Sequence, residues 1–320
     1  MSRIFRYQES INRFIKTRSC FSQVIKDDKS FNEIINKHDH YMSIILLTIA
    51  SNQYKKKKVK PPHGYYMATS IDTMSIIASL LNNEKYYIDK YGDIFVVNFV
   101  KETTVNILKC ISQNMESFED ILEKEHIIKI YHSITNFLYD KLVNLIKYEK
   151  MEGIIDAKKM DLIKYHFNDP KIIDDKYKKI KKIDKDKLLQ YVNDKYGSVA
   201  QCAFVIGWLL GLGEEDKIPI LESLGKSFGL MLKISNDFEN LERDLETSDG
   251  LSYNLVVNYG IYECFSMFMD NKLKIFNGCL ELDIFNITIK EVIDNMESKI
   301  DLVLKKTEME LKSEWSSFSN

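Results

Sequence analysis

Residues 233–245, KISNDFENLERDL, place side-chain oxygens at a spacing that could bind a metal ion. Asn236, Asn240 and Asp244 are four residues apart, so on a continuous helix they fall within an arc of about 80° on one face. Their oxygens then form a row about 12 Å long, given the helix rise of 1.5 Å per residue. Amide and carboxylate oxygens suit Mg²⁺ and not zinc. With so few charges, such a site needs an anionic ligand, for example a diphosphate, to complete its octahedron.

The alternative interpretation of this stretch is an ordinary polar helix face held by pairs of side chains four residues apart. The upstream residues 224–235, LGKSFGLMLKIS, are mostly apolar and carry Gly225 and Gly229 four apart. This spacing predicts a helix that packs closely against its neighbours. Polar residues at the end of a buried helix normally line a cavity or a paired site, which favours the metal site.

The rest of the sequence indicates which elements would position this row. Only four prolines and twelve glycines interrupt 320 residues, and apolar residues recur at helical period over most of the chain. The clearest amphipathic segments are 41–54, 70–81, 125–148, 222–245 and 288–315. Residues 92–100, GDIFVVNFV, are the best strand candidate, although a buried helix explains them equally well. We therefore expect one all-α domain over residues 1–320, with no sheet larger than a hairpin.

Charge and cysteine usage limit the partners. The net charge is −2, so no global field favours nucleic acid or an anionic membrane. The lysine-rich loop 55–64 lacks the aromatic residues of a nucleic-acid surface, and we interpret it as a solvated connection. The longest apolar runs, 41–50 and 202–212, are too short to span a bilayer. Five scattered cysteines and an N-terminus without an apolar signal core predict a cytoplasmic protein with reduced thiols.

The acid-amide row resembles two related families. Residues 224–240 are similar to the second aspartate motif of trans-prenyl diphosphate synthases, with Lys233 in place of the usual glutamine. They are even more similar to the metal triad of class I terpene cyclases, which continues to a glycine and an asparagine, here Gly250 and Asn254. Asparagine then replaces serine at 240, aspartate replaces glutamate at 244, and Arg243 stands where cyclases often carry a basic residue. Both families have the all-α isoprenoid synthase fold.

Two further blocks agree in order and spacing. Residues 195–211 resemble the family helix in which a lysine holds the substrate diphosphate, and Lys195 matches that lysine. Residues 70–92 resemble the helix that ends in the first aspartate motif, where Asn83, Glu84 and Asp89 take the places of the three aspartates. Only one of the three aspartates is kept in this first motif. Its position, about 150 residues before the second motif, is what supports the resemblance.

The resemblance implies a helical bundle around a central cavity. Asn236, Asn240 and Asp244 would hold Mg²⁺ and point toward Asn83, Glu84 and Asp89 on another helix. The diphosphate-binding residues would be Lys195, Arg243 and Lys233. Candidates for the cavity wall are Phe204, Trp208, Phe228 and Tyr253, although each is also typical of core packing. No side chain is assigned as a catalytic acid or base.

The function expected from the resemblance is that of a class I terpene cyclase, a lyase. It would convert farnesyl diphosphate to a sesquiterpene hydrocarbon or alcohol plus pyrophosphate. Chain-elongating synthases carry an early GKRxR-type cluster that binds isopentenyl diphosphate, and residues 32–47, NEIINKHDHYMSIILL, contain no arginine. The alternatives are a farnesyl or geranylgeranyl type of trans-prenyl diphosphate synthase and a non-catalytic synthase-like subunit. We expect a small-molecule allylic diphosphate as substrate, no nucleic acid and no membrane span; a homodimer is possible.

Overall fold

The structure is a computed structural model that describes residues 2–57, 64–82, 84–118, 122–146, 184–246 and 253–317. Most of these residues lie in helices and none lies in a strand, so the all-α prediction is confirmed. The first half contains α1 (Arg3–Thr17), α2 (Gln23–Lys26), α3 (Lys29–Lys37), α4 (Tyr41–Lys57), α5 (Tyr65–Asn82), α6 (Glu84–Tyr91), α7 (Asp93–Glu116) and α8 (Lys124–Ile146).

The second half contains α10 (Lys185–Val192), α11 (Ser198–Leu210), α12 (Ile218–Glu239), α13 (Leu241–Glu246), α15 (Leu255–Tyr259), α16 (Ile261–Glu281) and α17 (Ile287–Ser317). A π-helical turn, η2 (Asn193–Gly197), joins α10 to α11, and a 3₁₀ turn, η3 (Glu215–Lys217), precedes α12. The strand candidate at 92–100 is the beginning of α7, as the alternative helical interpretation had it.

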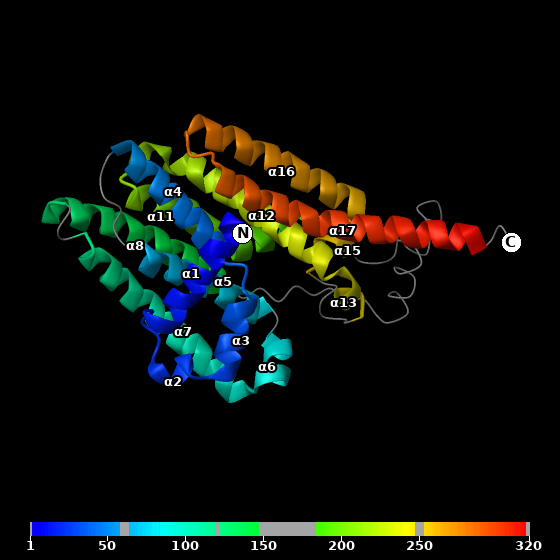
Figure 1. The fold of residues 1–320 in the computed structure, drawn as a ribbon, viewed down its shortest axis with the longest axis horizontal. Helices are drawn as coiled ribbons and strands as arrows, with labels where there is room; N and C mark the ends of the chain where they lie inside the picture. Colours follow the sequence, from blue (N-terminus) through cyan, green and yellow to red (C-terminus); the bar gives the residue numbers. More distant parts are fainter. Residues whose placement is uncertain are drawn as a thin grey trace.

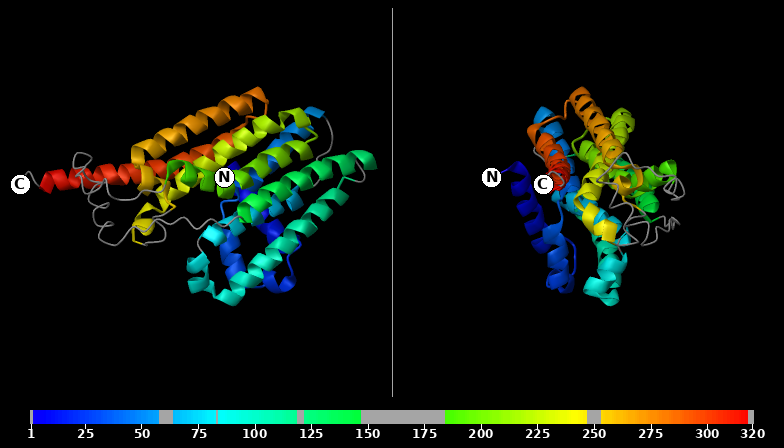
Figure 2. Two further views of the ribbon diagram at one scale, coloured as in Figure 1. Left: turned by 180° about the vertical axis from the view of Figure 1, so that it is seen from behind. Right: turned by 90° about the vertical axis from the view of Figure 1, so that its right-hand side faces the viewer.

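Helices α11 and α12 form the centre of the bundle. Every residue of α11 is buried, and this helix packs against α4, α8 and α12. Helix α12 in turn packs against α16 and α17, which lie along one side of it, whereas α3, α6 and α7 lie at the other side of the molecule (Figures 1 and 2). A helix that is apolar all round belongs in the interior, which is why the run 202–212 is core and not a membrane span.

Two glycines allow α12 to pack closely against α11 and η2. A Cβ atom at Gly225 would lie 2.5 Å from the Cα atom of Gln201 on α11, and one at Gly229 would lie 2.6 Å from the backbone nitrogen of Gly197 in η2. Any larger residue would therefore push α12 away from η2 and α11. The close packing predicted from the glycine spacing is confirmed, and it brings the end of α12 next to η2.

The described helices contain none that combines the length and apolarity needed to cross a membrane. The five cysteines are free; four are buried and Cys20 is half-buried.

Candidate functional site

Three parts of the fold meet around a cavity of about 140 Å³, which we call the site cavity. Its first wall is the segment from the end of α3 to the start of α4, its second is α5, and its third is η2 with α11 and the end of α12. The lining residues are Lys37, His38, Asp39, Tyr41, Met42, Ser75, Ala78, Ser79, Lys195, Tyr196, Val199, Leu232 and Asn236. Residues far apart in the sequence thus share one small space lined by both polar and apolar side chains.

The first wall owes its shape to helix termini. Asp28 caps α3 by accepting hydrogen bonds from the backbone nitrogens of Ser30 and Phe31, which fixes where this short helix begins. Helix α3 ends at Lys37, and His38 is already extended, with ψ of 134°. The chain then turns through His40, which has φ of +57°, before α4 begins. Lys37 and His38 consequently lie at the cavity and not on a continued helix.

The π-helical turn η2 brings a further basic residue, Lys195, to the site cavity. Its hydrogen bond from the nitrogen of Ser198 to the carbonyl of Asn193 spans five residues, and such one-turn bulges often mark functional sites. The turn presents Lys195 and Tyr196 to the site cavity. Lys195 is buried, and its ammonium donates to the carbonyl of Leu145 on α8. Burial lowers the pKa of Lys195, because a desolvated ammonium is disfavoured.

The acid-amide row is interrupted in the structure. Helix α12 ends at Glu239, and Asn240 is its cap, with φ of −97° and ψ of 5°. The backbone bonds from Asn240 to Asn236 (3.0 Å) and from Asp244 to Asn240 (2.8 Å) nevertheless keep the helical spacing across the break. Asn236 is half-buried and lines the site cavity. The side-chain amide of Asn240 instead donates to the carbonyl of Asn236 at 2.8 Å.

Lys233 and Asp237 form an ion pair inside the protein. They are 6% and 3% exposed, the ammonium donates to Oδ1 of the carboxylate, and the backbone nitrogen of Leu255 donates to Oδ2 at 2.7 Å. Burial raises the pKa of Asp237 to about 6, against the opposing effects of Lys233 and the Leu255 N–H. Burial is the largest single influence on Lys233 and acts to lower its pKa, but Asp237, Tyr196 and Asp244 together raise it. Lys233, predicted to bind diphosphate, is thus held by Asp237, and its ammonium lies 5.7 Å from the ring centre of Tyr196.

Asp244 is similarly engaged. Its Oδ1 accepts from Nε and Nη2 of Arg243 at 3.2 and 3.1 Å, and its Oδ2 accepts from the amide of Asn254 at 3.0 Å. Asn254 also donates to the carbonyl of Asp237 and caps α15 by accepting from the nitrogen of Val257. Asp244 is only 8% exposed. Both carboxylate oxygens of Asp244 thus already accept hydrogen bonds, and the assignment of Asn236, Asn240 and Asp244 as Mg²⁺ ligands stays a prediction.

The first-motif residues are described only in part. Asn83 and the side chain of Glu84 lie outside the described residues. Asp89 is exposed on α6, while its neighbours on that helix face a second hollow of about 190 Å³, which we call the side groove. The side groove is lined by Ile34, Lys37, His38, Ile76, Ser79, Tyr86, Tyr87, Lys90 and Tyr91, and so shares Lys37, His38 and Ser79 with the site cavity.

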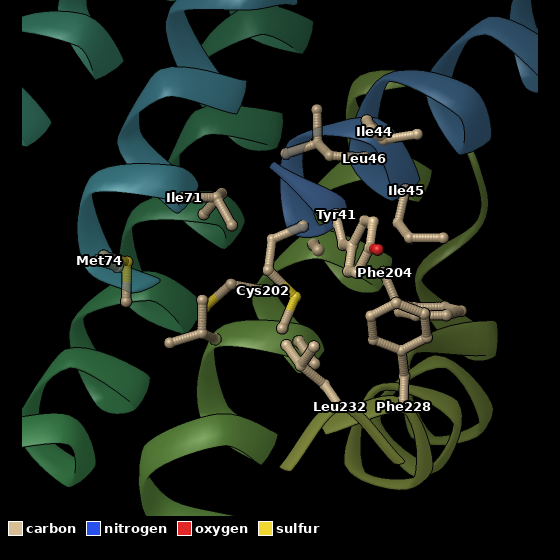
Figure 3. Close-up of a cluster of buried hydrophobic side chains, with 14 of the residues drawn as sticks. Tyr41, Ile44, Ile45, Leu46, Ile71, Met74, Cys202, Phe204, Phe228 and Leu232 are labelled. Atoms are coloured by element: carbon tan, nitrogen blue, oxygen red, sulfur yellow. The ribbon is translucent and has the colours of Figure 1, made fainter. Parts of the chain in front are cut away.

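The four aromatic candidates for the cavity wall occupy different environments. Phe204 and Phe228 are fully buried in the packed core with Ile45 and Leu232, their ring centres 5.7 Å apart (Figure 3). Trp208 donates through Nε1 to the carbonyl of Glu214. Tyr253 is half-buried and packs against Tyr191 with ring centres 4.8 Å apart. Within the described chain, none of the four lines the site cavity or the side groove.

Sequence reasoning gave no role to Lys37 and His38, which the structure places on the cavity wall. The histidine pair 38/40 is visible in the sequence. That His38 lies at the site cavity depends on the end of α3 at Lys37, which only the structure shows. With Lys37 and His38 included, the balance of basic and acidic side chains around the site cavity can be stated. Lys37, His38 and Lys195 are the basic residues of this lining, and the ammonium of Lys37 also pairs with Glu33 at 2.8 Å. The one lining carboxylate, Asp39, is paired with Lys299 at 3.1 Å. Such a lining suits an anionic group such as a phosphate.

Comparison with known proteins shows what the fold is. No protein-family model matches the chain, and no curated protein matches its sequence. Among solved structures, the chain is similar to a geranyltransferase from Helicobacter pylori complexed with magnesium and isoprenyl diphosphate, with 12% identity, a TM-score of 0.54, and coverage of 95% of this chain and 99% of that one.

Two other solved structures are similar. A geranyltransferase from Legionella pneumophila has 11% identity, a TM-score of 0.56, and coverage of 93% of this chain and 94% of that one. An FPP/GFPP synthase from Zymomonas mobilis has 10% identity, a TM-score of 0.53, and coverage of 93% and 98%. At these identities the similarity establishes the fold alone, and the chain has the all-helical isoprenoid synthase fold.

Proposed function

We propose that this chain is an isoprenyl diphosphate synthase of the prenyltransferase type, which joins an allylic diphosphate to isopentenyl diphosphate. One observation carries the proposal: basic residues from two separate elements line the site cavity, Lys37 and His38 on one wall and Lys195 on another. Condensation needs two diphosphate groups in one space. Residues 32–47 contain no basic cluster of the GKRxR type, and we assign the second diphosphate to Lys37 and His38 at the end of α3.

The diphosphate and the isoprenyl chain of the proposed substrate would lie in two different hollows, the site cavity and the side groove. The site cavity is smaller than the roughly 300–1,000 Å³ of typical ligand sites, so it fits the diphosphate groups and not a whole isoprenyl chain. The adjoining side groove offers Ile34 and Ile76 with three tyrosines. Apolar and aromatic surface of this kind suits a hydrocarbon tail, and a tyrosine face stabilises a nearby carbocation. Accommodating a farnesyl-length tail would still require the helices to part.

The residues of the chain would act on the leaving group. As the allylic C–O bond breaks, negative charge grows on the departing diphosphate, and Lys195 is placed to stabilise it by a charge-assisted hydrogen bond. Lys37 and His38 would hold the second diphosphate. Mg²⁺ would supply further charge neutralisation when bound, as suggested by the magnesium in the Helicobacter pylori complex. Asn236 is the predicted metal ligand already positioned at the cavity.

Terpene cyclisation is the second candidate, and it rests on a different observation. The structure joins Asp244 to Asn254 at 3.0 Å, and these are two of the positions by which the sequence resembles cyclases. A cyclase needs only one diphosphate and would leave Lys37 and His38 without a substrate role.

A product assay separates these functions. The purified protein is incubated with farnesyl diphosphate, Mg²⁺ and radiolabelled isopentenyl diphosphate, and both diphosphates and volatile products are analysed. We expect label in a longer diphosphate, and a rate lowered about 100-fold in Lys195→Met, as is typical when a charge-stabilising donor is removed. Lys290→Met, far from the cavity on α17, is the control.

Two other outcomes would reject the proposal. A volatile C15 product from farnesyl diphosphate, with no label incorporated, would identify a cyclase. No turnover of any allylic diphosphate by the folded protein would favour a non-catalytic subunit.

A further inference from the structure

A cluster of three side chains lies beside the site cavity. Two of them, His40 and Asp72, have no role in the proposed function, and the third, His38, also lines the cavity. His38 and His40 flank Asp39 in the segment between α3 and α4, and Asp72 faces them from α5. His40 and Asp72 are completely buried, and the side chain of His38 is 21% exposed. One potential ligand atom from each residue lies within 4.8 Å of the other two.

The hydrogen bonds of this cluster leave two buried atoms without a partner. His40 contacts Oδ2 of Asp72 through Nδ1 at 2.7 Å and Oδ1 of Asn12 through Nε2 at 2.9 Å. In contrast, Nε2 of His38 and Oδ1 of Asp72 have no hydrogen-bond partner among the described residues. Buried polar atoms are almost always satisfied, so a pair left open at one place calls for a missing ligand.

The separation of those two atoms fits a shared metal ion. They are 3.7 Å apart, which is too long for a hydrogen bond. With metal–ligand bonds of about 2.0–2.1 Å, a separation of this size corresponds to an angle at the metal of about 124–135°. A movement of a few tenths of an ångström would bring the angle to the tetrahedral value.

The backbone is shaped to bring the two histidines together. His40 has φ of +57°, a left-handed conformation that non-glycine residues adopt rarely and usually for a reason. This turn brings the two imidazoles edge to face, with ring centres 5.1 Å apart and planes at 89°. On a regular helix, residues two apart would point in different directions.

We propose that His38, His40 and Asp72 form a binding site for a first-row transition-metal dication, with Zn²⁺ as the representative ion. Two imidazole nitrogens and one carboxylate oxygen suit such an ion and not Mg²⁺. The ion takes Nε2 of His38 and Oδ1 of Asp72 and replaces the proton between Nδ1 of His40 and the carboxylate, so binding releases protons. It ties the segment that carries Lys37 to α5, and through His38 it borders both the site cavity and the side groove.

The test measures binding directly and needs no activity. Full-length metal-free protein is titrated with ZnCl₂ against a chromogenic chelator in excess MgCl₂, and we expect one Zn²⁺ per chain. His38→Ala should weaken binding by about 100-fold or more, because losing even an outer-shell partner costs 10–100-fold. Zn²⁺ should also raise the melting temperature of the wild type and not that of His38→Ala. His132→Ala, an exposed histidine on α8, should behave as wild type.

A Co²⁺ spectrum identifies the donor atoms. Cobalt held by nitrogen and oxygen should give visible bands without the near-ultraviolet charge transfer of a thiolate ligand. The proposal is overturned if the wild type binds no stoichiometric Zn²⁺, if His38→Ala binds it as tightly as the wild type, or if a thiolate band appears. A variant of the fully buried Asp72, such as Asp72→Asn, can fail to fold. His38→Ala still tests the metal site in that case, because Nε2 of His38 makes no hydrogen bond that the fold requires.

Discussion

Lys233 offers a direct choice between a structural and a substrate role. In the structure its ammonium pairs with Asp237 inside the protein, and the two residues are 6% and 3% exposed. Lys233→Met removes the cation while keeping most of the side-chain volume. The carboxylate of Asp237 then stays buried with the backbone N–H of Leu255 as a donor. Removing one partner of a buried ion pair costs about 3–5 kcal/mol, a large part of the roughly 5–15 kcal/mol that stabilises a typical protein.

A second variant tests the physical reason for this loss. In Lys233→Met/Asp237→Asn the uncompensated charge is gone, and the asparagine oxygen can still accept from Leu255. Neutral replacement of a buried pair is often close to neutral in stability, so we expect the double variant to lie within about 1–2 kcal/mol of the wild type. Lys290 pairs with Asp294 at the same spacing of four residues on the exposed surface of α17. Lys290→Met is therefore the matched control and should leave the unfolding midpoint unchanged.

The free energy of unfolding is measured in urea by far-ultraviolet circular dichroism and by tryptophan fluorescence, whose agreement checks the two-state assumption. Binding of farnesyl diphosphate is measured on the same variants. If Lys233→Met unfolds like Lys290→Met but loses affinity for the diphosphate, the ion-pair argument is refuted. Lys233 would then be the diphosphate ligand that the sequence predicted.

Three further predictions concern packing, capping and reactivity. Gly229→Ala should destabilise the fold by about 1–3 kcal/mol, because the added methyl group would meet the backbone of η2. The methyl group of Gly278→Ala would meet only the end of a leucine side chain, so this variant should cost less. Thermal midpoints in the opposite order would contradict this prediction. Asn254→Ala should lower the free energy of unfolding by about 1–2 kcal/mol through the lost cap of α15; unchanged urea unfolding would count against it. A hydrogen bond from Cys110 outweighs burial and, with nearby lysines, lowers the pKa of Cys20 to about 7. Alkylation of Cys20, followed by mass spectrometry, should therefore accelerate as pH rises through about 7, and a rate that rises only above the ordinary thiol pKa of about 8.5 would disprove the shift.

The fold was largely predictable because helix periodicity and the lack of breakers are local properties. Segments 41–54 and 70–81 lie within α4 and α5, and the described part of 125–148 lies within α8. The spacing of Gly225 and Gly229 correctly indicated a close helix contact. The interruption at Asn240 was not predicted, because a long amphipathic pattern looks the same whether or not one residue leaves the helix.

The candidate site was predictable only in its chemistry. The sequence by itself determined that oxygen donors lie four residues apart near the end of α12 and that Lys195 begins the apolar block before it, since these are matters of residue type and spacing. Whether each polar group is free to bind a ligand depends on what lies opposite it. Only the tertiary structure decided that Lys233 and Asp244 are engaged by Asp237, Arg243 and Asn254.

The tertiary structure likewise decided which distant segments share a space. Lys37 and His38 meet Lys195 and Asn236 because α3 ends at residue 37, the chain turns at His40, and η2 bulges toward them. More than 150 residues separate these groups along the chain, and no local pattern encodes their meeting. The sequence determined the helices and the kinds of ligand atoms they carry, whereas the packing of helix ends, set by backbone turns and close contacts, determined which of those atoms face the cavity.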